Sequence, residues 1–263
     1  MVAGLGVGAL APLDSCGSIG TAQPTVNYTF ADDFDGPAGS APDPSKWGYD
    51  VGGGIWGNSE LEVYTSARAN SFLDGSGNLV IRATKNVETS DGQSTTTYHS
   101  ARLKTLGKFS QYRGTFEARI KLDVQPGLWP AWWSMGANID EAGWPACGEV
   151  DMLENYGGSV AQTSVHTPDN AGTGMLTKEA DIAVDDGWHT WRMWWETGTG
   201  GFTFYKDGVE YLAVAPAQMA NWRFNAGVPM FMLLNLAVGG TAGPPPDTVQ
   251  FPVDLLVDYV RVW

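Results

Sequence analysis

Residues 148–155 read Gly-Glu-Val-Asp-Met-Leu-Glu-Asn, a segment with three carboxylates that decides how we interpret the rest of the chain. Pro145 and Gly148 lie at its start, and Gly157-Gly158 follows it, which leaves too little room for a helix. The residues between these breakers are mostly apolar or acidic and have the length of a strand. The segment therefore predicts a short buried strand.

The spacing of the acids then predicts where they point. Side chains on a strand alternate between faces, so Glu149 and Asp151 share one face and a regular strand would turn Glu154 to the other. One extra residue, a β-bulge at Met152-Leu153, would return Glu154 to the first face. We therefore expect three acids in a row on one side of a sheet.

Such a row suits the hydrolysis of glycosidic bonds with retention. That reaction needs an ionised carboxylate as nucleophile and a protonated one as acid, about 5–5.5 Å apart. Neighbouring carboxylates cannot all ionise cheaply, so at least one pKa in the row must rise. Two alternatives stay open from the spacing alone: an exposed acidic strand edge, or a calcium-binding loop. Calcium loops favour Gly, Asn and backbone carbonyl ligands over a run that contains Val, Met and Leu.

The flanking sequence resembles glycoside hydrolase family 16, and within it the bacterial endo-β-1,3-glucanases, or laminarinases. The resemblance lies first in the segments 127–133, Gly-Leu-Trp-Pro-Ala-Trp-Trp, and 143–155, which ends in the E-x-D-x-x-E acid row. Further stretches match in order along about residues 28–263: residues 56–65, 187–191, 204–208, 235–240 and 257–263.

The resemblance implies a reaction and leaves its substrate open. It implies a retaining endo-glycosidase acting on β-1,3-linked glucan of the laminarin type. Glu62, where the family more often has Gln, and the Thr-Ala-Gly-Pro-Pro-Pro run after Gly240 depart from the pattern. Alternatives are the same chemistry on mixed-linkage β-1,3-1,4-glucan or a galactan, transglycosylation, or a non-hydrolytic glucan-binding protein. Binding-only relatives typically lose the catalytic glutamates, which this chain keeps.

Composition agrees with an all-β fold in one catalytic domain, residues 27–263. The chain has 263 residues, 43% of them hydrophobic, and its 34 glycines and 15 prolines suit short strands joined by tight turns. Lys206-Asp207-Gly208 between two apolar runs is typical of a hairpin turn. We predict a two-sheet antiparallel β-sandwich, a jelly roll, with a carbohydrate-binding cleft on its concave face. We expect no further module after the strand over residues 254–263.

The resemblance assigns roles to the acids and their surroundings. Glu149 would be the nucleophile, Glu154 the general acid and then base, and Asp151 a residue that hydrogen-bonds Glu149. Residues expected to contact the sugar are Trp56, Trp129, Trp133 and Trp144 on the cleft walls, Asn58, Glu60, Arg68 and Asn70 in the glycone subsites, and His166 near the acid. On sequence alone His166 is equally an ordinary strand histidine. Trp191, Trp194 and Trp195 are expected in the core or on sheet faces.

The net charge of −14 argues against nucleic acids and anionic membranes as partners, and it leaves a neutral polysaccharide as the expected one. We expect a monomer with no insertion into a membrane. No His/Cys/Asp cluster has the spacing of a zinc site, so we expect no cofactor for catalysis. The resemblance implies a structural calcium away from the cleft, at Asp33, Gly77 and Asp258.

Residues 1–26 are interpreted as a truncated signal-like or disordered lead-in. Residues 1–13 resemble the apolar part of a secretory signal without its basic start and are too short to span a bilayer. Ser15-Cys16 is compatible with a lipid-attachment site at the cell envelope, although Asp14 is a poor fit to the sequence motif of such sites. We expect a secreted, extracellular protein in which Cys16 and Cys147 are both free thiols.

Overall fold

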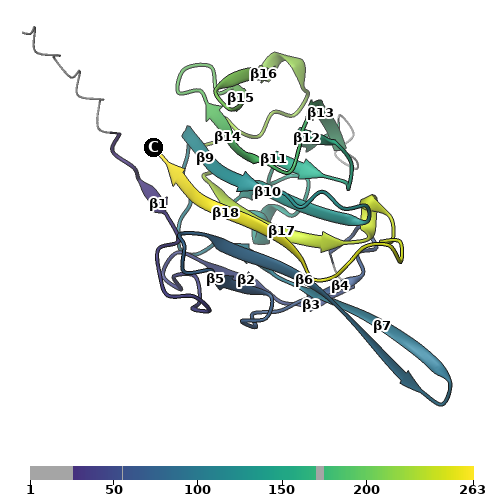
Figure 1. Cartoon of the computed structure of the whole chain (residues 1–263). Coiled ribbons are helices and arrows are strands. Elements are labelled where there is room, and N and C mark those ends of the chain that lie inside the picture. The colour runs from purple at the N-terminus through teal and green to yellow at the C-terminus, as the bar shows by residue number, and fades with distance from the viewer. Residues whose placement is uncertain (1–25, 55, 170–174) are drawn as a thin grey trace, which may run out of the picture.

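Two β-sheets packed face to face form the protein in a computed structural model that describes residues 26–54, 56–169 and 175–263 (Figure 1). Among the strands of these ranges, every pair is antiparallel except one, β4 (Glu62–Tyr64) beside β7 (Gln93–Ser100). The predicted two-sheet antiparallel sandwich is confirmed.

The smaller sheet has seven strands and carries the site. Its strands run in the order β13 (Met175–Ala183), β12 (Val160–Pro168), β11 (Glu149–Asn155), β10 (Leu128–Gly136), β17 (Met230–Val238), β8 (Arg102–Lys104) and β2 (Gly48–Asp50).

The larger sheet has eleven strands. Its main path is β16 (Val209–Val214), β15 (Phe202–Lys206), β14 (Trp188–Trp195), β9 (Gly114–Lys121), β18 (Val253–Val262), β6 (Leu79–Ser90), β7, β4 and β3 (Gly52–Gly53). β1 (Phe30–Asp32) lies beside β18, and β5 (Ser71–Leu73) lies beside β6. The helical turns α1 (Ile139–Ala142), η1 (Pro216–Gln218) and η2 (Gly240–Ala242) are short.

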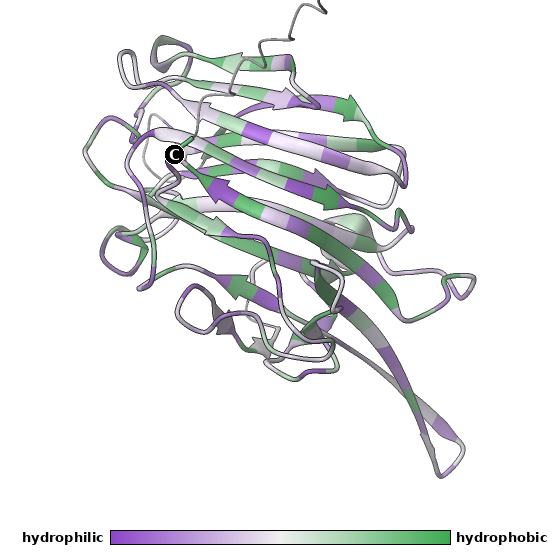
Figure 2. Ribbon diagram, turned by 60° about the vertical axis from the view of Figure 1, so that its left-hand side comes forward, coloured by the Kyte–Doolittle hydropathy of each residue, from purple (hydrophilic) through white to green (hydrophobic). Residues whose placement is uncertain are grey.

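The core lies between the sheets because strand side chains alternate between faces. Figure 2 shows this alternation as apolar and polar bands along the strands. Trp191 and Trp195 of β14 are buried in the core, whereas Trp194 between them is 41% exposed on the outer face of the larger sheet. The three tryptophans therefore divide between core and sheet face, as predicted.

The turns also follow the sequence. Lys206 pairs with Val209 across the β15–β16 hairpin, and Asp207 and Gly208 between them have φ values of 52° and 79°. Positive φ at both central residues is the geometry of a two-residue hairpin turn, which Asp-Gly adopts readily. The β6–β7 hairpin is longer and extends away from the body of the protein (Figure 1).

Two sequence-based expectations concern the N-terminal region and membranes. The lead-in over residues 1–26 lies outside the described residues except for Val26, and so does Cys16. Cys147 is a free, buried cysteine. Within the described ranges, no helix has the length and apolar character needed to cross a bilayer.

Candidate active site

A β-bulge in β11 brings the three acids to one face. On the β10 side, Trp133 is opposite Asp151 and Trp132 is opposite Leu153, so Met152 has no partner of its own. On the β12 side, Asp151 pairs with Ser164 and Glu154 with Gln162. The extra residue is therefore at the predicted position, Met152-Leu153.

The bulge has a clear cause in packing. Met152 and Leu153 are consecutive residues, yet both are buried in the core together with Val150. Two consecutive apolar side chains reach the same side of a sheet only where the alternation is broken. Burying both turns Glu154 to the opposite side, where Glu149 and Asp151 already lie.

The acid row lines a cleft of about 520 Å³ on the face of the seven-stranded sheet that points away from the core. Most of the sequence-predicted residues lie in its lining. They are Glu149, Asp151, Glu154, Trp56, Asn58, Glu60, Trp129, Trp133, Trp144 and His166. A concave site with aromatic walls and a few convergent polar groups is typical of a ligand-binding cleft.

Two predicted residues lie elsewhere. Asn70 is 3% exposed, and its side-chain amide donates to the carbonyl oxygens of Arg82 and His99, so it ties strands together instead of facing sugar. Arg68 is outside the cleft lining and donates to the hydroxyl of Tyr49 at 3.0 Å. The expectation that both hold glycone hydroxyls is not supported by their placement, because neither side chain reaches the cleft.

Each terminal acid of the row has its own indole donor. Trp144 Nε1 donates to Glu149 Oε2 at 2.9 Å, and Trp129 Nε1 donates to Glu154 Oε1 at 3.0 Å. The hydroxyl of Tyr156 also hydrogen-bonds Glu154. These donors orient the two carboxyls and favour their charged forms.

His166 lies beside the middle of the row. Its Nε2 is 2.9 Å from Asp151 Oδ2 and 4.0 Å from Glu149 Oε1, and its Nδ1 contacts Thr177 Oγ1 at 2.8 Å. His166 is therefore part of the site, and the alternative of an ordinary core histidine is excluded. Asp151 Oδ2 lies close to the imidazole but without the geometry of a hydrogen bond, and the expected hydrogen bond from Asp151 to Glu149 stays a prediction.

Burial dominates the electrostatics of the row. It raises the pKa of Glu149 to about 8, and the charge of Asp151 adds to this while His166 opposes it. Burial, followed by the charge of Asp151, likewise raises the pKa of Glu154 to about 8. Burial raises the pKa of Asp151 well above its usual range. The row therefore retains protons at neutral pH, as a site that needs a carboxylic acid requires.

Atoms of Glu149, Asp151 and His166 also lie within 4.8 Å of one another, close enough to hold a metal ion. The contact between His166 and Asp151 at 2.9 Å explains this closeness without an ion. An imidazole between carboxyls serves proton chemistry equally well.

A polar network supports the wall next to the acid row. Trp133 Nε1 donates to Asn235 Oδ1 at 2.7 Å, and Asn235 Nδ2 donates to the Tyr64 hydroxyl at 3.0 Å. The guanidinium of Arg102 lies over the rings of Trp56 and Trp133, with 4.8 and 4.7 Å to their centroids. Sequence reasoning missed Asn235, Arg102 and Tyr156. Of these three, only Tyr156 could have been expected from its position in the sequence, two residues after Glu154.

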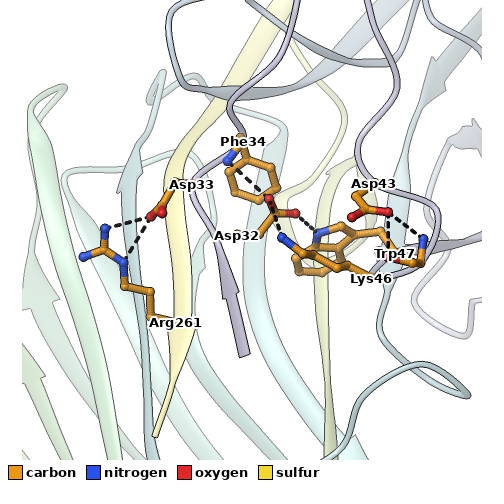
Figure 3. Close-up of polar contacts among 8 residues, drawn as sticks. Asp32, Asp33, Phe34, Asp43, Lys46, Trp47 and Arg261 are labelled. Carbon is orange, nitrogen blue, oxygen red and sulfur yellow. Dashed lines mark hydrogen bonds and ion pairs between the residues drawn. The ribbon is translucent and has the colours of Figure 1, made fainter. Parts of the chain in front are cut away.

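The residues expected to hold calcium do not form a carboxylate cluster. Arg261 Nη2 lies 2.7 Å from Asp33 Oδ1, as Figure 3 shows, and Arg119 Nη1 lies 2.6 Å from Asp258 Oδ2. Gly77 does lie near Asp33, since a Cβ placed on it would be 3.9 Å from the Asp33 carbonyl oxygen. In this arrangement both carboxylates pair with arginines, so a bound calcium would have to replace these ion pairs, and the site stays a prediction.

The fold and the cleft define a class of protein: a β-sandwich enzyme that cleaves carbohydrate with a row of carboxyl groups. Residues 58–255 match the family described as glycosyl hydrolases family 16. The chain belongs to this family, and it is a retaining glycoside hydrolase.

Individual relatives agree. A β-glucanase of Rhodothermus marinus is 34% identical over 97% of this chain and 92% of its own length. The laminarinase catalytic domain of Thermotoga maritima is 32% identical, with a TM-score of 0.77 over 90% of this chain and 97% of that one. The endo-β-1,3-glucanase of Pyrococcus furiosus is 36% identical, with a TM-score of 0.77 over 89% of this chain and 93% of that one.

Proposed function

We propose that this protein is a retaining endo-β-1,3-glucanase in which Glu149 is the nucleophile and Glu154 is the acid and base. The observation that carries the proposal is the acid row, with an indole donor on each terminal carboxyl and a bulge that sets all three acids on one face. Similarity to laminarinases and to a β-glucanase supports the choice of a β-glucan as substrate.

The two glutamates have different surroundings. Glu149 lies 4.0 Å from His166 and accepts from Trp144 Nε1, whereas Glu154 accepts from Trp129 Nε1 and from the Tyr156 hydroxyl. The charge of Asp151 raises the pKa of both glutamates, which helps the row to keep the proton that a general acid donates. The order of the acids in the E-x-D-x-x-E row supports Glu149 as the nucleophile and Glu154 as the acid.

The reaction then proceeds in two steps. The Glu149 carboxylate attacks the anomeric carbon as Glu154 gives its proton to the leaving oxygen, and a covalent glycosyl-enzyme forms. Glu154, now a carboxylate, takes a proton from water, which attacks the anomeric carbon and releases Glu149.

The cleft walls supply the surface for a glucan chain. Trp56, Trp129, Trp133 and Trp144 all line the cleft, and flat indole faces suit stacking against sugar rings. Asn58 and Glu60 add polar groups at one wall, which suit hydrogen bonds to sugar hydroxyls.

Release of reducing ends from linear β-1,3-glucan, mixed-linkage β-glucan and agarose tests the proposal, with Glu149→Gln as the control. We expect rapid release from β-1,3-glucan by the wild type and none by the variant. If only another polymer is cleaved, the proposed mechanism stands and the substrate assignment changes to that polymer. Binding without cleavage by the wild type would favour a glucan-binding protein instead.

The remaining expectations extend the proposal. We propose that the protein is secreted, because a polysaccharide of this kind is met outside the cell. We also propose that it acts as a monomer. Fractionation of the producing cells, together with the sedimentation of the purified protein, tests both statements. A structural calcium stays a prediction from the family resemblance, and thermal unfolding with and without a chelator tests it. An unchanged melting temperature would set calcium aside.

A further inference from the structure

Glu62 is a buried carboxyl group behind the wall of the cleft. It begins β4 and is 1% exposed. Its Oε2 accepts the backbone N–H of Val238 at 2.6 Å, but its Oε1 is buried without a hydrogen-bond partner. An unpartnered buried acceptor is costly, whereas a proton on Oε1 would turn that oxygen into a donor.

The acceptor for such a proton is Glu60. Glu60 lines the cleft, and its two oxygens accept from the Tyr64 hydroxyl at 3.2 Å and from Asn58 Nδ2 at 3.4 Å. Burial raises the pKa of Glu62 to about 8. A hydrogen bond that protonated Glu62 makes to Glu60, and the charge of Glu60, both add to this rise. Below that pH Glu62 is neutral and has a proton to donate.

Other ionisable groups around Glu62 leave this proton in place. Tyr98 is directly opposite Glu62 on β7, with His99 next to it opposite Val63, and β17 contributes the backbone of Val238. Burial raises the pKa of Tyr64 well above its usual range, so Tyr64 stays neutral.

The charge of Arg102 on β8 acts on Tyr64, the neighbour of Glu60 in this network. Arg102 Nε is already 3.1 Å from Asp50 Oδ2, so this cation is paired elsewhere.

The pair of Glu60 and Glu62 is linked to the wall beside the acid row. The Tyr64 hydroxyl that donates to Glu60 accepts from Asn235, which in turn accepts from the indole of Trp133. Trp133 is directly opposite Asp151 in the β10–β11 register. The orientation of Glu60 is thus part of the hydrogen-bonded wall that faces the substrate.

We propose that Glu62 is a positioning residue that donates its proton to Glu60 and so holds the Glu60 carboxylate in place to bind a sugar hydroxyl. This inference rests on the proposed function, because it takes the ligand to be a β-glucan chain. When Glu62 loses its proton, the buried Glu62 carboxylate and the partly buried Glu60 carboxylate repel each other, and Glu60 is displaced from its place in the wall.

Glu62→Gln is the sharpest test. A glutamine amide is neutral at every pH, can donate to Glu60 and can accept from the Val238 N–H. Binding of a β-1,3-gluco-oligosaccharide is measured by calorimetry at pH 6.5 and pH 9.5. The two proteins compared are Glu149→Gln, which does not turn the ligand over, and Glu149→Gln with Glu62→Gln.

We expect the affinity of Glu149→Gln to fall by about tenfold more than that of the double variant between these pH values, as loss of one charge-assisted hydrogen bond predicts. The acid row titrates in both proteins, so the difference between them isolates Glu62. A parallel loss of affinity in both would overturn the inference. Glu62→Leu, which cannot donate, should bind weakly at both pH values, and its melting curve shows whether it folds.

Failure of the proposed function looks different. If Glu149→Gln does not bind the oligosaccharide at pH 6.5 and the wild type cleaves no β-glucan, the substrate assignment fails and the role of Glu62 in binding it fails as well. Binding at pH 6.5 with equal pH dependence in the two proteins would leave the glucanase intact and remove only Glu62 from its machinery.

Discussion

His166 Nε2 lies 2.9 Å from Asp151 Oδ2, so an imidazole and a carboxyl form a pair in the centre of the acid row. Because Asp151 faces the imidazole, its role in the site is more than that of a hydrogen-bond partner for Glu149. It places a group that can carry positive charge among three carboxyls whose pKa values burial raises. The charge of the row thus depends on where a small number of protons reside.

Asp151→Asn tests this arrangement. The charge of Asp151 is the second cause, after burial, that raises the pKa of Glu154 to about 8. Removing that charge should lower the pKa of the general acid, and the alkaline limb of kcat/KM should move to lower pH. We expect activity to remain but to fall by about a hundredfold. A pH–rate profile measures both effects, and an unmoved alkaline limb would contradict them.

The raised pKa values also predict how stability depends on pH. A carboxyl whose pKa rises on folding, from about 4.5 to about 8, favours the folded state below pH 4.5 and loses that contribution as pH rises to 8. Glu149→Gln and Glu154→Gln remove this loss. Each variant should melt on the order of 10 °C higher than the wild type at pH 8 and show no such gain at pH 4.

The control for this prediction is an exposed glutamate far from the cleft, such as Glu88 on the β6–β7 hairpin. Glu88→Gln should leave the melting temperature unchanged at both pH values. Scanning calorimetry across the pH range makes the comparison, and equal gains at pH 4 and pH 8 would mean that the stabilisation does not come from the protons of the row.

The indole donors offer a matched pair of substitutions. Trp144→Phe removes the N–H that Glu149 accepts, and Trp129→Phe removes the one that Glu154 accepts, while an aromatic ring remains in each case. Losing a donor to the charged form should raise the pKa of the carboxyl concerned. We expect the acidic limb of the pH–rate profile to move up for Trp144→Phe and the alkaline limb to move up for Trp129→Phe. Movement of the same limb in both variants would contradict the separate roles of the two glutamates.

The sequence was sufficient to predict the acid row because the information is local. Strand periodicity, the apolar pair Met152-Leu153 and the third acid together require a bulge, and the structure has it at that position. The Asp207-Gly208 turn was predictable for the same reason, since turn type depends on the residues in the turn.

Other parts of the site depend on contacts between distant segments. Asn235 reaches the wall only because β17 pairs with β10, and no local pattern in the sequence predicts that pairing. Asn70 was expected in the cleft because the family resemblance places it in a glycone subsite, yet it is buried where β5 meets β6. The carboxylates of Asp33 and Asp258 were expected to bind calcium, and their arginine partners come from other strands.

The bulge itself is open to a direct test by deletion. Removing Met152 would leave Asp151 and Leu153 adjacent, so that strict alternation would keep Glu149, Asp151 and Glu154 on one face without a bulge. Met152→Ala keeps the extra residue and loses only buried side-chain volume, at a cost of about 2–5 kcal/mol in stability. We expect measurable hydrolysis by Met152→Ala at a temperature where it is folded. The deletion variant, checked for β-structure by circular dichroism at the same temperature, should also retain hydrolysis, because its three acids still share one face. A folded deletion variant without activity would contradict this prediction and show that the bulge sets the position of Glu154 along the cleft as well as its face.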